Sequence, residues 1–298
     1  MNPRKQLQFF DAHRDRNRPL VLAAVFETQG STYSKAGAHM LINEDGVFRG
    51  MLSGGCLEGD LAVRAQVVLE SGVPQIVTYD LATDDELWGL GVGCDGLMRI
   101  VLLPLLSATA YTPFAEIAAI LRGRESGAVR IELPGETPGE ICIRVEPPPQ
   151  VLILGAGMDA EPLLRFASEL GWRCTIVDHR PAYLEAGDFS AAVARHCMPA
   201  AELATTVDLS AYQMAIVMSH HLESDRTYLR QLAATDMPYV GLLGPANRRQ
   251  RLLDDIGDLG DSLKPRLHGP AGLDIGSRGP EAIGLSIVAE MQQVFASR

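Results

Sequence analysis

The sequence predicts an α/β protein with two domains, in which a mixed α/β domain is followed by a doubly wound domain built on a parallel sheet. Three observations support this fold class. The chain has 298 residues, which is long for a single hydrophobic core. Residues 147–149 are consecutive prolines, which resist both helix and central strand. After them, short apolar runs alternate with segments of helical spacing, as in chains that form parallel sheets. We therefore expect domains at 1–146 and 151–298, joined by a hinge at 147–150.

The first domain is expected to open as a sheet. Apolar runs between turn residues predict its strands at 20–26, 37–43, 47–52, 74–79 and 97–104. Helical spacing of apolar residues predicts helices at about 60–71 and 113–122. Two further runs, at 128–133 and 140–145, predict a hairpin that closes the domain.

The second domain is expected to begin with a strand, a helix and a second strand. These elements are predicted at 151–154, 160–170 and 174–177. Strand-like runs at 191–194, 213–218 and 238–242 continue the alternation. The pattern is typical of a Rossmann-like domain, in which helices cover both faces of a parallel sheet.

The composition of the chain excludes several classes of protein. Its formal net charge is −11 and its isoelectric point is near 5.1, so no broad basic surface is expected to bind nucleic acid. No run of about 18 uncharged apolar residues occurs, and 1–18 contains no apolar leader core, which predicts a cytoplasmic protein without a membrane span. The five cysteines form no Cys-x-x-Cys pair, so neither a disulfide framework nor a structural zinc site is expected.

A pair of glycines precedes the cysteine at position 56. Gly54 and Gly55 allow backbone angles that other residues avoid, so a ligand can approach the main chain closely at this turn. The helical spacing that begins at Leu61 places Cys56 near a helix N-terminus, where unpaired N–H groups favour a thiolate. The turn is therefore either a reactive corner or a tight turn with an inert, buried cysteine. A second glycine-rich corner contains Cys94.

A glycine-rich turn also follows the first strand of the second domain. Gly155, Gly157 and Ala160 fit the pattern G-x-G-x-x-G/A between a predicted strand and a predicted helix. In dinucleotide-binding domains these positions make the turn, admit a diphosphate and let the helix pack on the strand. Asp178, at the end of the next strand, suits a ribose hydroxyl, whereas Arg180 suits a phosphate, so NAD and NADP both stay open. The alternative is a Rossmann-like loop that no longer binds a nucleotide.

Further candidates follow the later strands. His220 comes after the strand at 213–218, at the carboxyl edge where such sheets bind ligands, but its neighbour His221 does not imply a shared metal. Two glycine-rich loops near the end of the chain can present main-chain amides to a ligand, although ordinary loops have the same composition. Their candidate residues are Gly241, Gly244, Gly272 and Asp274.

Several motifs occur together, in one order, along nearly the whole chain. In the first domain they lie at 30–33, 35–40, 52–58 and 91–94. In the second they lie at 155–157, 177–180, 225, 239–244, 272–276 and 286–290. Together they resemble the XdhC/CoxI family, accessory proteins that mature molybdenum hydroxylases such as xanthine dehydrogenase. Asp95 departs from the glycine usual in the family, and a carboxylate beside Cys94 disfavours a thiolate there.

The resemblance implies a protein that binds the molybdenum cofactor, shields it while its terminal sulfur ligand is installed, and hands it to the apoenzyme of a molybdenum hydroxylase. The cofactor is molybdopterin or its cytosine dinucleotide form, and the implied partners are a cysteine desulfurase and a second copy of the chain. On this hypothesis Cys56 is a ligand of the molybdenum or touches its sulfur, Ser53 to Gly55 offer N–H groups, and Glu58 orients the turn. The loop at Gly155 would hold the phosphate tail of the cofactor.

Two other functions stay open. An oxidoreductase that uses NAD(P) is favoured by the loop at Gly155 and by Asp178, with Cys56 or His220 near the hydride acceptor. A carrier of persulfide sulfur, with Cys56 receiving sulfur from a cysteine desulfurase, is the third hypothesis.

Overall fold

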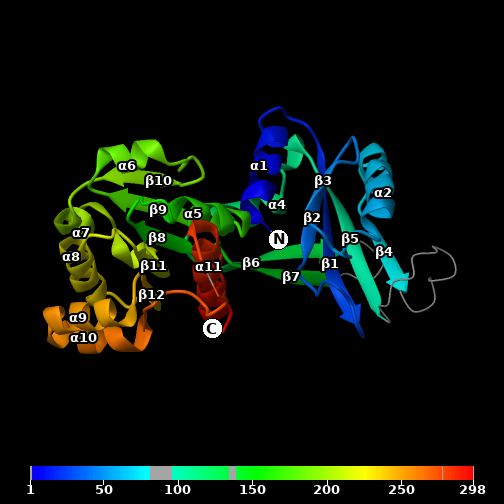
Figure 1. Ribbon diagram of the computed structural model, residues 1–298. Helices are drawn as coiled ribbons and strands as arrows, with labels where there is room; N and C mark the ends of the chain where they lie inside the picture. Colours follow the sequence, from blue (N-terminus) through cyan, green and yellow to red (C-terminus); the bar gives the residue numbers. More distant parts are fainter. Residues whose placement is uncertain (1, 81–95, 134–138, 277, 298) are drawn as a thin grey trace. The chain divides into compact units, whose positions relative to one another are not determined.

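The chain forms two compact units, Met1–Pro147 and Pro148–Arg298. Our computed structural model describes residues 2–80, 96–133, 139–276 and 278–297 (Figure 1). The division between the units falls inside the run of prolines. Of the helices in these described ranges, none combines the length and the apolar character needed to cross a membrane.

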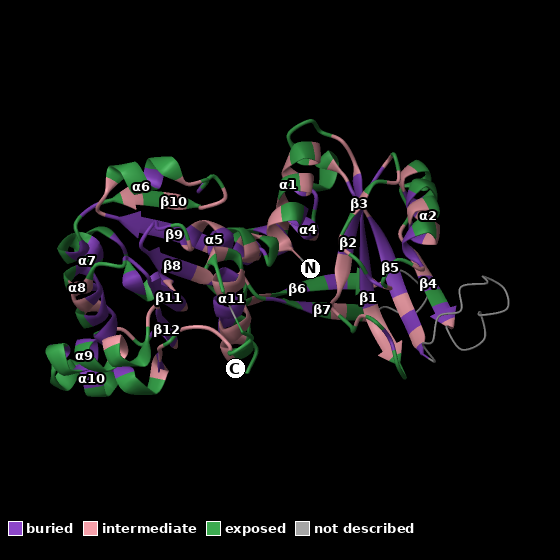
Figure 2. Ribbon diagram, viewed as in Figure 1, coloured by how far each residue is buried: buried purple, intermediate pink, exposed green. Residues whose placement is uncertain are grey.

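An antiparallel sheet with β1 (Leu20–Gln29) at its centre forms the first unit. The strand order is β3-β2-β1-β5-β4, in which β2 (His39–Asn43) and β5 (Leu97–Leu105) flank β1, and β3 (Phe48–Arg49) and β4 (Gln75–Asp80) form the edges. Residues 20–25 of β1 are all buried (Figure 2). Alternate side chains of this run enter the cores on the two faces of the sheet. This two-sided burial explains the unbroken apolar run of the strand.

Helices cover both faces of this sheet. On one face α2 (Glu58–Ser71) packs through Leu61, Ala65 and Val68. The elements on the other face are α1 (Pro3–Arg14), α4 (Phe114–Arg122) and the hairpin of β6 (Gly127–Leu133) and β7 (Gly139–Val145). A short 3₁₀ helix lies at Ser107–Thr109.

The strand predicted at 47–52 is reduced to the two residues of β3. Gly50 has a φ of +114°, and a Cβ atom at this position would lie 2.7 Å from the Cα atom of Met40. The chain leaves the sheet here, and the N–H group of Leu52 bonds to the side chain of Glu58 instead of to a strand.

The second unit is built on a parallel sheet with the strand order β10-β9-β8-β11-β12-β13 (Figure 1). Its strands are β8 (Gln150–Leu154), β9 (Arg173–Asp178), β10 (Ala194–Cys197), β11 (Met214–Val217), β12 (Tyr239–Leu242) and β13 (Leu267–His268). This sheet confirms the predicted fold class. β10 begins at Ala194, the last residue of the strand predicted at 191–194. Val193, which precedes β10, donates its N–H group to the carbonyl of Cys174 in β9.

Helices lie on both faces of the parallel sheet. One face is covered by α5 (Ala160–Glu169), α6 (Pro181–Ala186) and α11 (Pro280–Ala296). The other is covered by α7 (Leu203–Thr206), α8 (Leu222–Ala233), α9 (Ala246–Ile256) and α10 (Asp258–Leu263). Short 3₁₀ helices lie at Ala200–Glu202, Leu209–Ala211 and Lys264–Arg266.

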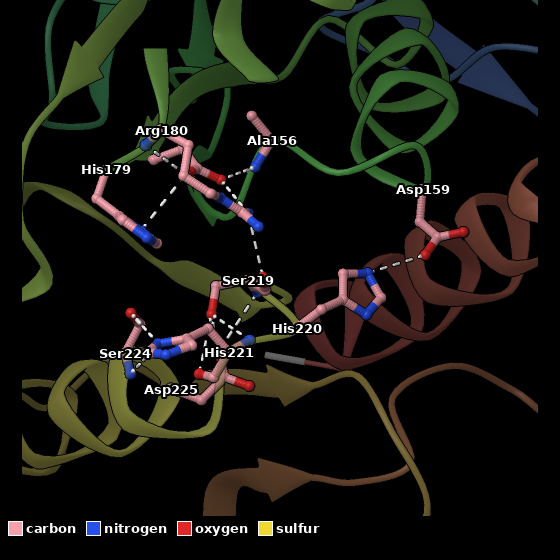
Figure 3. A network of polar contacts seen from close by, with 10 residues as sticks. Ala156, Asp159, His179, Arg180, Ser219, His220, His221, Ser224 and Asp225 are labelled. Atoms are coloured by element: carbon pink, nitrogen blue, oxygen red, sulfur yellow. Dashed lines mark hydrogen bonds and ion pairs between the residues drawn. The ribbon is translucent and has the colours of Figure 1, made fainter. Parts of the chain in front are cut away.

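The strand order reverses direction at one position of this sheet. The chain proceeds from β8 outward through β9 to β10, and then returns to the other side of β8 with β11. Loops on the two sides of the boundary between β8 and β11 therefore lead in opposite directions, and sheets of this kind are expected to have a ligand crevice at the carboxyl ends of such strands. The segments at 155–159, 178–180 and 219–221 meet at this edge (Figure 3).

Candidate functional site

The turn before α2 is held together by the carboxylate of Glu58. This buried side chain accepts hydrogen bonds from the N–H groups of Leu52 (2.7 Å), Ser53 (2.9 Å) and Gly55 (3.0 Å). It also accepts one from the hydroxyl of Ser53, whose oxygen in turn accepts the N–H group of Leu57 at 2.7 Å. Burial acts to raise the pKa of Glu58, but these donors outweigh it and hold the pKa below its usual value. The turn is therefore a rigid structure with an ionised carboxylate at its centre.

Two glycines shape the outer side of this turn. Gly54 and Gly55 have φ angles of +80° and +114°, which side chains rarely adopt. Cys56 follows them, half-buried against the apolar core under α2 and two residues before that helix begins. Its thiol is neither fully exposed nor fully buried in the core.

One part of the sequence-based hypothesis for the turn needs correction. The sequence led us to expect the N–H groups of Ser53 and Gly55 to face a ligand, but both bond to Glu58. The expected role of Glu58 in orienting the turn agrees with these bonds. Cys94, the cysteine of the second glycine-rich corner, lies outside the described residues.

A change at Glu58 tests how much this carboxylate stabilises the first unit. Glu58→Gln replaces one acceptor oxygen by an N–H₂ group facing N–H donors, so we expect the free energy of unfolding to fall by about 1–3 kcal/mol. Urea denaturation followed by circular dichroism measures it, with Glu70→Gln on the exposed side of α2 as the matched control. Folding lowers the pKa of Glu58, so the ionised carboxylate stabilises the folded state at neutral pH. This stabilisation is lost as the pH falls from the pKa of an unfolded glutamate, about 4.3, through the lower pKa that Glu58 has in the folded protein. A Glu58→Gln variant whose stability matches the wild type at pH 7 would contradict this account.

The glycine-rich loop of the second unit has the geometry of a tight strand-to-helix turn. Gly155 has a φ of +126°, and a Cβ atom there would lie 2.5 Å from the carbonyl group of Met218 at the end of β11. Ala160 is fully buried at the start of α5, where a small residue lets the helix approach the sheet. At Gly157, however, a Cβ atom would lie 3.3 Å from the imidazole of His220. The ring of His220 therefore lies where a diphosphate would approach Gly157.

His220 is held in this position by a neighbouring carboxylate. Its Nε2 atom lies 3.3 Å from Oδ2 of Asp159, and its backbone has a φ of +59°, which is uncommon for a residue with a side chain (Figure 3). His221 has a different role, because its Nδ1 atom accepts the N–H group of Ser224 and caps α8. No group of three or more potential metal ligands occurs within the described residues.

The carboxylate of Asp178 is saturated by internal donors. Oδ1 accepts the N–H group and Nε of Arg180, both at 2.9 Å, and Oδ2 accepts the N–H group of Ala156 at 2.8 Å and Nη2 of Arg180 at 2.7 Å (Figure 3). These bonds use all four acceptor positions of the carboxylate. Burial would raise the pKa of Asp178, but the hydrogen bonds from Arg180 and Ala156 keep it lowered.

Arg180 is fixed by the same arrangement. Besides the pair with Asp178, its Nη2 donates to the carbonyl of Ser219 at 3.1 Å and its guanidinium lies 3.7 Å from the ring centroid of Tyr183. The expected contacts of Asp178 with a ribose and of Arg180 with a phosphate therefore disagree with this geometry. Both residues instead tie the loop after β8 to the ends of β9 and β11.

A second buried ion pair lies beside the first and was not predicted from the sequence. Asp225 is 1% exposed and pairs with Arg248 at 2.7 Å, while its other oxygen accepts the hydroxyl of Ser219. Arg248 also fills the space beside Gly244, where a Cβ atom would lie 2.8 Å from its Cδ. Asp225 is one of the residues on which the resemblance to the XdhC/CoxI family rests. Its partner Arg248 is 23 residues away in the sequence, so no short motif indicates the ion pair.

The loop at 269–276 is fastened by Glu290 of α11. Its carboxylate accepts the N–H group of Gly272 (2.8 Å) and the hydroxyl of Tyr239 (2.7 Å), and lies 3.2 Å from Nδ1 of His268. The main-chain amide of Gly272 is therefore bonded within the protein. Asp274 lies exposed on the loop, and Gly241 is buried within β12.

A cavity of about 350 Å³ lies beside the glycine-rich loop, on the side of α5 and α6. Its wall includes Gly157, Met158, Glu161, Tyr183 and Phe189. The lining is largely apolar, and the Met158 side chain is 83% exposed. The cavity thus offers space for a small organic group next to the loop, while ion pairs occupy the expected crevice itself.

Two family models match the chain. The one described as "XdhC Rossmann domain" matches residues 151–291, and the one described as "XdhC and CoxI family" matches residues 13–80. A protein of Bacillus subtilis (strain 168), named as a probable subunit of xanthine dehydrogenase, is 30% identical over 319 aligned positions, covering 95% of each chain. The chain belongs to the XdhC and CoxI family.

Two further similarities concern this member of the XdhC and CoxI family. The "molybdenum cofactor insertion chaperone PaoD" of Escherichia coli (strain K12) is 21% identical, with 92% of this chain and 83% of that protein covered. A crystal structure from Bacillus halodurans, described as that of a xanthine dehydrogenase, is 29% identical with a TM-score of 0.86, covering 98% of this chain and 96% of that one. The folds of both units are thus shared with a solved relative.

Proposed function

We propose that this chain is an accessory protein that binds the molybdenum cofactor, protects it during sulfuration and delivers it to the apoenzyme of a xanthine dehydrogenase-type hydroxylase. Membership of the XdhC and CoxI family supports this role, as do the names of the two bacterial relatives. The observation that carries it in the structure is the half-buried thiol of Cys56 on a turn that Glu58 makes rigid. A thiol on a fixed turn suits binding without turnover.

The residues of the turn fit the soft end of such a cargo. Thiolate sulfur is a matched ligand for a molybdenum–dithiolene group, whereas hydroxyl or carboxylate oxygen is a poorer one. Glu58 keeps its charge within the turn, bonded to main-chain donors, and so leaves the Cys56 sulfur as the soft donor. The role of Cys56 in this proposal is to contact the molybdenum or its sulfur ligand while Glu58 fixes its position.

The second unit fits a phosphate tail less well. A diphosphate at the loop of Gly155 requires His220 to leave Gly157 and Asp159. Asp178 and Arg180 are already paired, so the tail would depend on main-chain donors of the loop. The same geometry weakens the alternative of an NAD(P)-dependent oxidoreductase. A persulfide carrier is the remaining alternative: the thiol of Cys56 would take the outer sulfur of a persulfide on a cysteine desulfurase, which would leave as a thiol.

The same proposal includes the source of the sulfur, the location of the protein, its assembly and the form of its cargo. A cysteine desulfurase would supply the terminal sulfur, the protein would act in the cytoplasm, and two copies would form a homodimer. The cargo would be molybdopterin or its cytosine dinucleotide form. Mass spectrometry of the nucleotide released on denaturation distinguishes the two forms.

A transfer experiment tests the proposed delivery. The chain is purified natively from cells that make molybdenum cofactor and is mixed with a hydroxylase apoenzyme from cells that lack the chain. We expect hydroxylase activity to appear and molybdenum to leave the chain. If the activity rises no further than with an equal amount of released cofactor, the proposed delivery is wrong, and oxidation of NAD(P)H with an added carbonyl substrate would favour the oxidoreductase instead.

A further inference from the structure

The first unit contains a cavity that none of the functions above uses. It has a volume of about 510 Å³ and lies between the start of α1, the loop after β1 and the end of β3. This volume is within the range of small-molecule sites and exceeds the need of an inorganic ion. The side chains that line it include Lys5, Gln6, Tyr33, Ser34, Arg49 and Met51.

The charges of this cavity are all of one sign. Lys5 and Arg49 line it, and the described residues in its wall include no aspartate or glutamate. In a chain with a formal net charge of −11, such a wall is a local reversal of charge. The guanidinium of Arg49 lies 5.4 Å from the ring centroid of Phe9 and donates one hydrogen bond, from Nη1 to the carbonyl of Phe48. Its planar fork thus has further donors for an anion, and such forks pair well with phosphate.

A buried amide provides an independent indication of a ligand. Gln6 lines the cavity but is only 2% exposed, and its Nε2 atom has no hydrogen-bond partner within the described residues. Buried donors of this kind are almost always satisfied in proteins, so this N–H₂ group is a candidate donor for a bound molecule. The first turn of the twelve-residue helix α1 lies at the same wall and adds the positive end of its dipole.

One side of the cavity is aromatic and connects to the turn of Cys56. Tyr33 is 64% exposed, which is unusual for so large an apolar surface, and its ring lies 3.3 Å from the position of a Cβ atom at Gly54. Met51 is likewise 46% exposed at the cavity wall. An aromatic ring beside a cationic wall suits a molecule with a flat heterocycle and a phosphate.

We infer that this cavity binds the phosphate monoester of a small planar heterocycle, with Arg49, Lys5 and the amide of Gln6 around the phosphate and Tyr33 against the ring. A mononucleotide and a pterin phosphate share this chemistry. The assignment to a pterin phosphate rests on the proposed function, whereas the phosphate site itself does not. It gives the first unit an anion site next to the turn of Cys56.

Calorimetric titration of the cofactor-free full chain tests the inference with guanosine monophosphate, which carries the aminopyrimidinone edge of a pterin. We expect the nucleotide to bind at least roughly tenfold more tightly than guanosine, and a Lys5→Gln/Arg49→Gln variant to lose at least roughly tenfold in affinity. Gln6→Leu should weaken binding without lowering the melting temperature. Arg130→Gln/Arg144→Gln, which removes two exposed charges from the hairpin of the same unit, should bind like the wild type.

The outcomes separate this inference from the proposed function. Equal binding of guanosine and its monophosphate, no binding of either, or equal losses in the two double variants would overturn the phosphate site. If the Lys5→Gln/Arg49→Gln variant loses the nucleotide but retains molybdenum cofactor, the site stands with a mononucleotide as its ligand. If the nucleotide binds as expected while no preparation contains molybdenum cofactor, the site stands and the proposed function fails.

Discussion

Replacing Asp178 with alanine is expected to lower the free energy of unfolding of the second unit by about 3–5 kcal/mol. The change leaves Arg180 with its charge beside the crevice and frees the N–H group of Ala156, both of which now bond to the Asp178 carboxylate. Asp178→Asn keeps the shape but loses the charge and one pair of acceptors, so it should lower the stability by a smaller amount, about 1–3 kcal/mol. Chemical denaturation monitored by circular dichroism measures both, and Glu185→Ala on the exposed side of α6 is the control.

The same variants decide between two roles for this carboxylate. A residue whose purpose is to hold a ribose would weaken nucleotide binding when changed and leave the fold intact. The structure instead assigns Asp178 to the connection between β8, β9 and the loop after β11. Wild-type stability in Asp178→Ala, together with a loss of NAD(P) binding, would therefore overturn our interpretation of the crevice.

Replacing Cys56 with serine is expected to reduce the molybdenum that co-purifies with the chain by roughly tenfold or more. A serine hydroxyl has nearly the shape of the thiol but is a hard and weakly acidic group, so it is a poor ligand for the soft metal. The variant should fold like the wild type, because Cys56 is only half-buried and the bonds of Glu58 do not involve its sulfur.

Elemental analysis of the purified variant gives the molybdenum content, with Cys142→Ser on the exposed face of β7 as the matched control. The control should retain as much molybdenum as the wild type. If Cys56→Ser also retains it, Cys56 is not a ligand. If molybdenum is retained but the terminal sulfur is lost, the residue acts on the sulfur alone.

The fold follows from the sequence where local patterns are strong. Residues 20–26 are recognisable as a strand because their apolar run has no interruption. The turn at Gly155 is recognisable because Gly155, Gly157 and Ala160 fit G-x-G-x-x-G/A between a strand and a helix, and the structure gives the reason for the first glycine, since a Cβ atom there would lie 2.5 Å from the carbonyl group of Met218. The helix at the start of the chain was not predicted, although it carries local marks. Asn2 caps it by accepting the N–H group of Lys5, and Pro3 occupies its first turn. Its apolar residues are few, so the hydrophobic pattern alone is weak.

The sites were predictable in position but less so in bonding. The sequence places Asp178 at the end of a strand and Arg180 two residues later, and both lie at the crevice as expected. Which donor occupies a carboxylate is decided by folding, since it depends on distances between loops that are remote in sequence. For the same reason the pair of Asp225 with Arg248 and the cavity at Lys5 and Arg49 emerge only from the structure.

The measurement that tests the proposed function most directly is a census of the small molecules in the natively purified wild-type chain. The protein is made in cells with an intact cofactor pathway, and its molybdenum is determined by elemental analysis and its pterin by fluorescence after denaturation. Our account predicts molybdenum and pterin in equal amounts, both reduced in Cys56→Ser. A preparation that contains neither, or one that contains NAD(P) in their place, would contradict it.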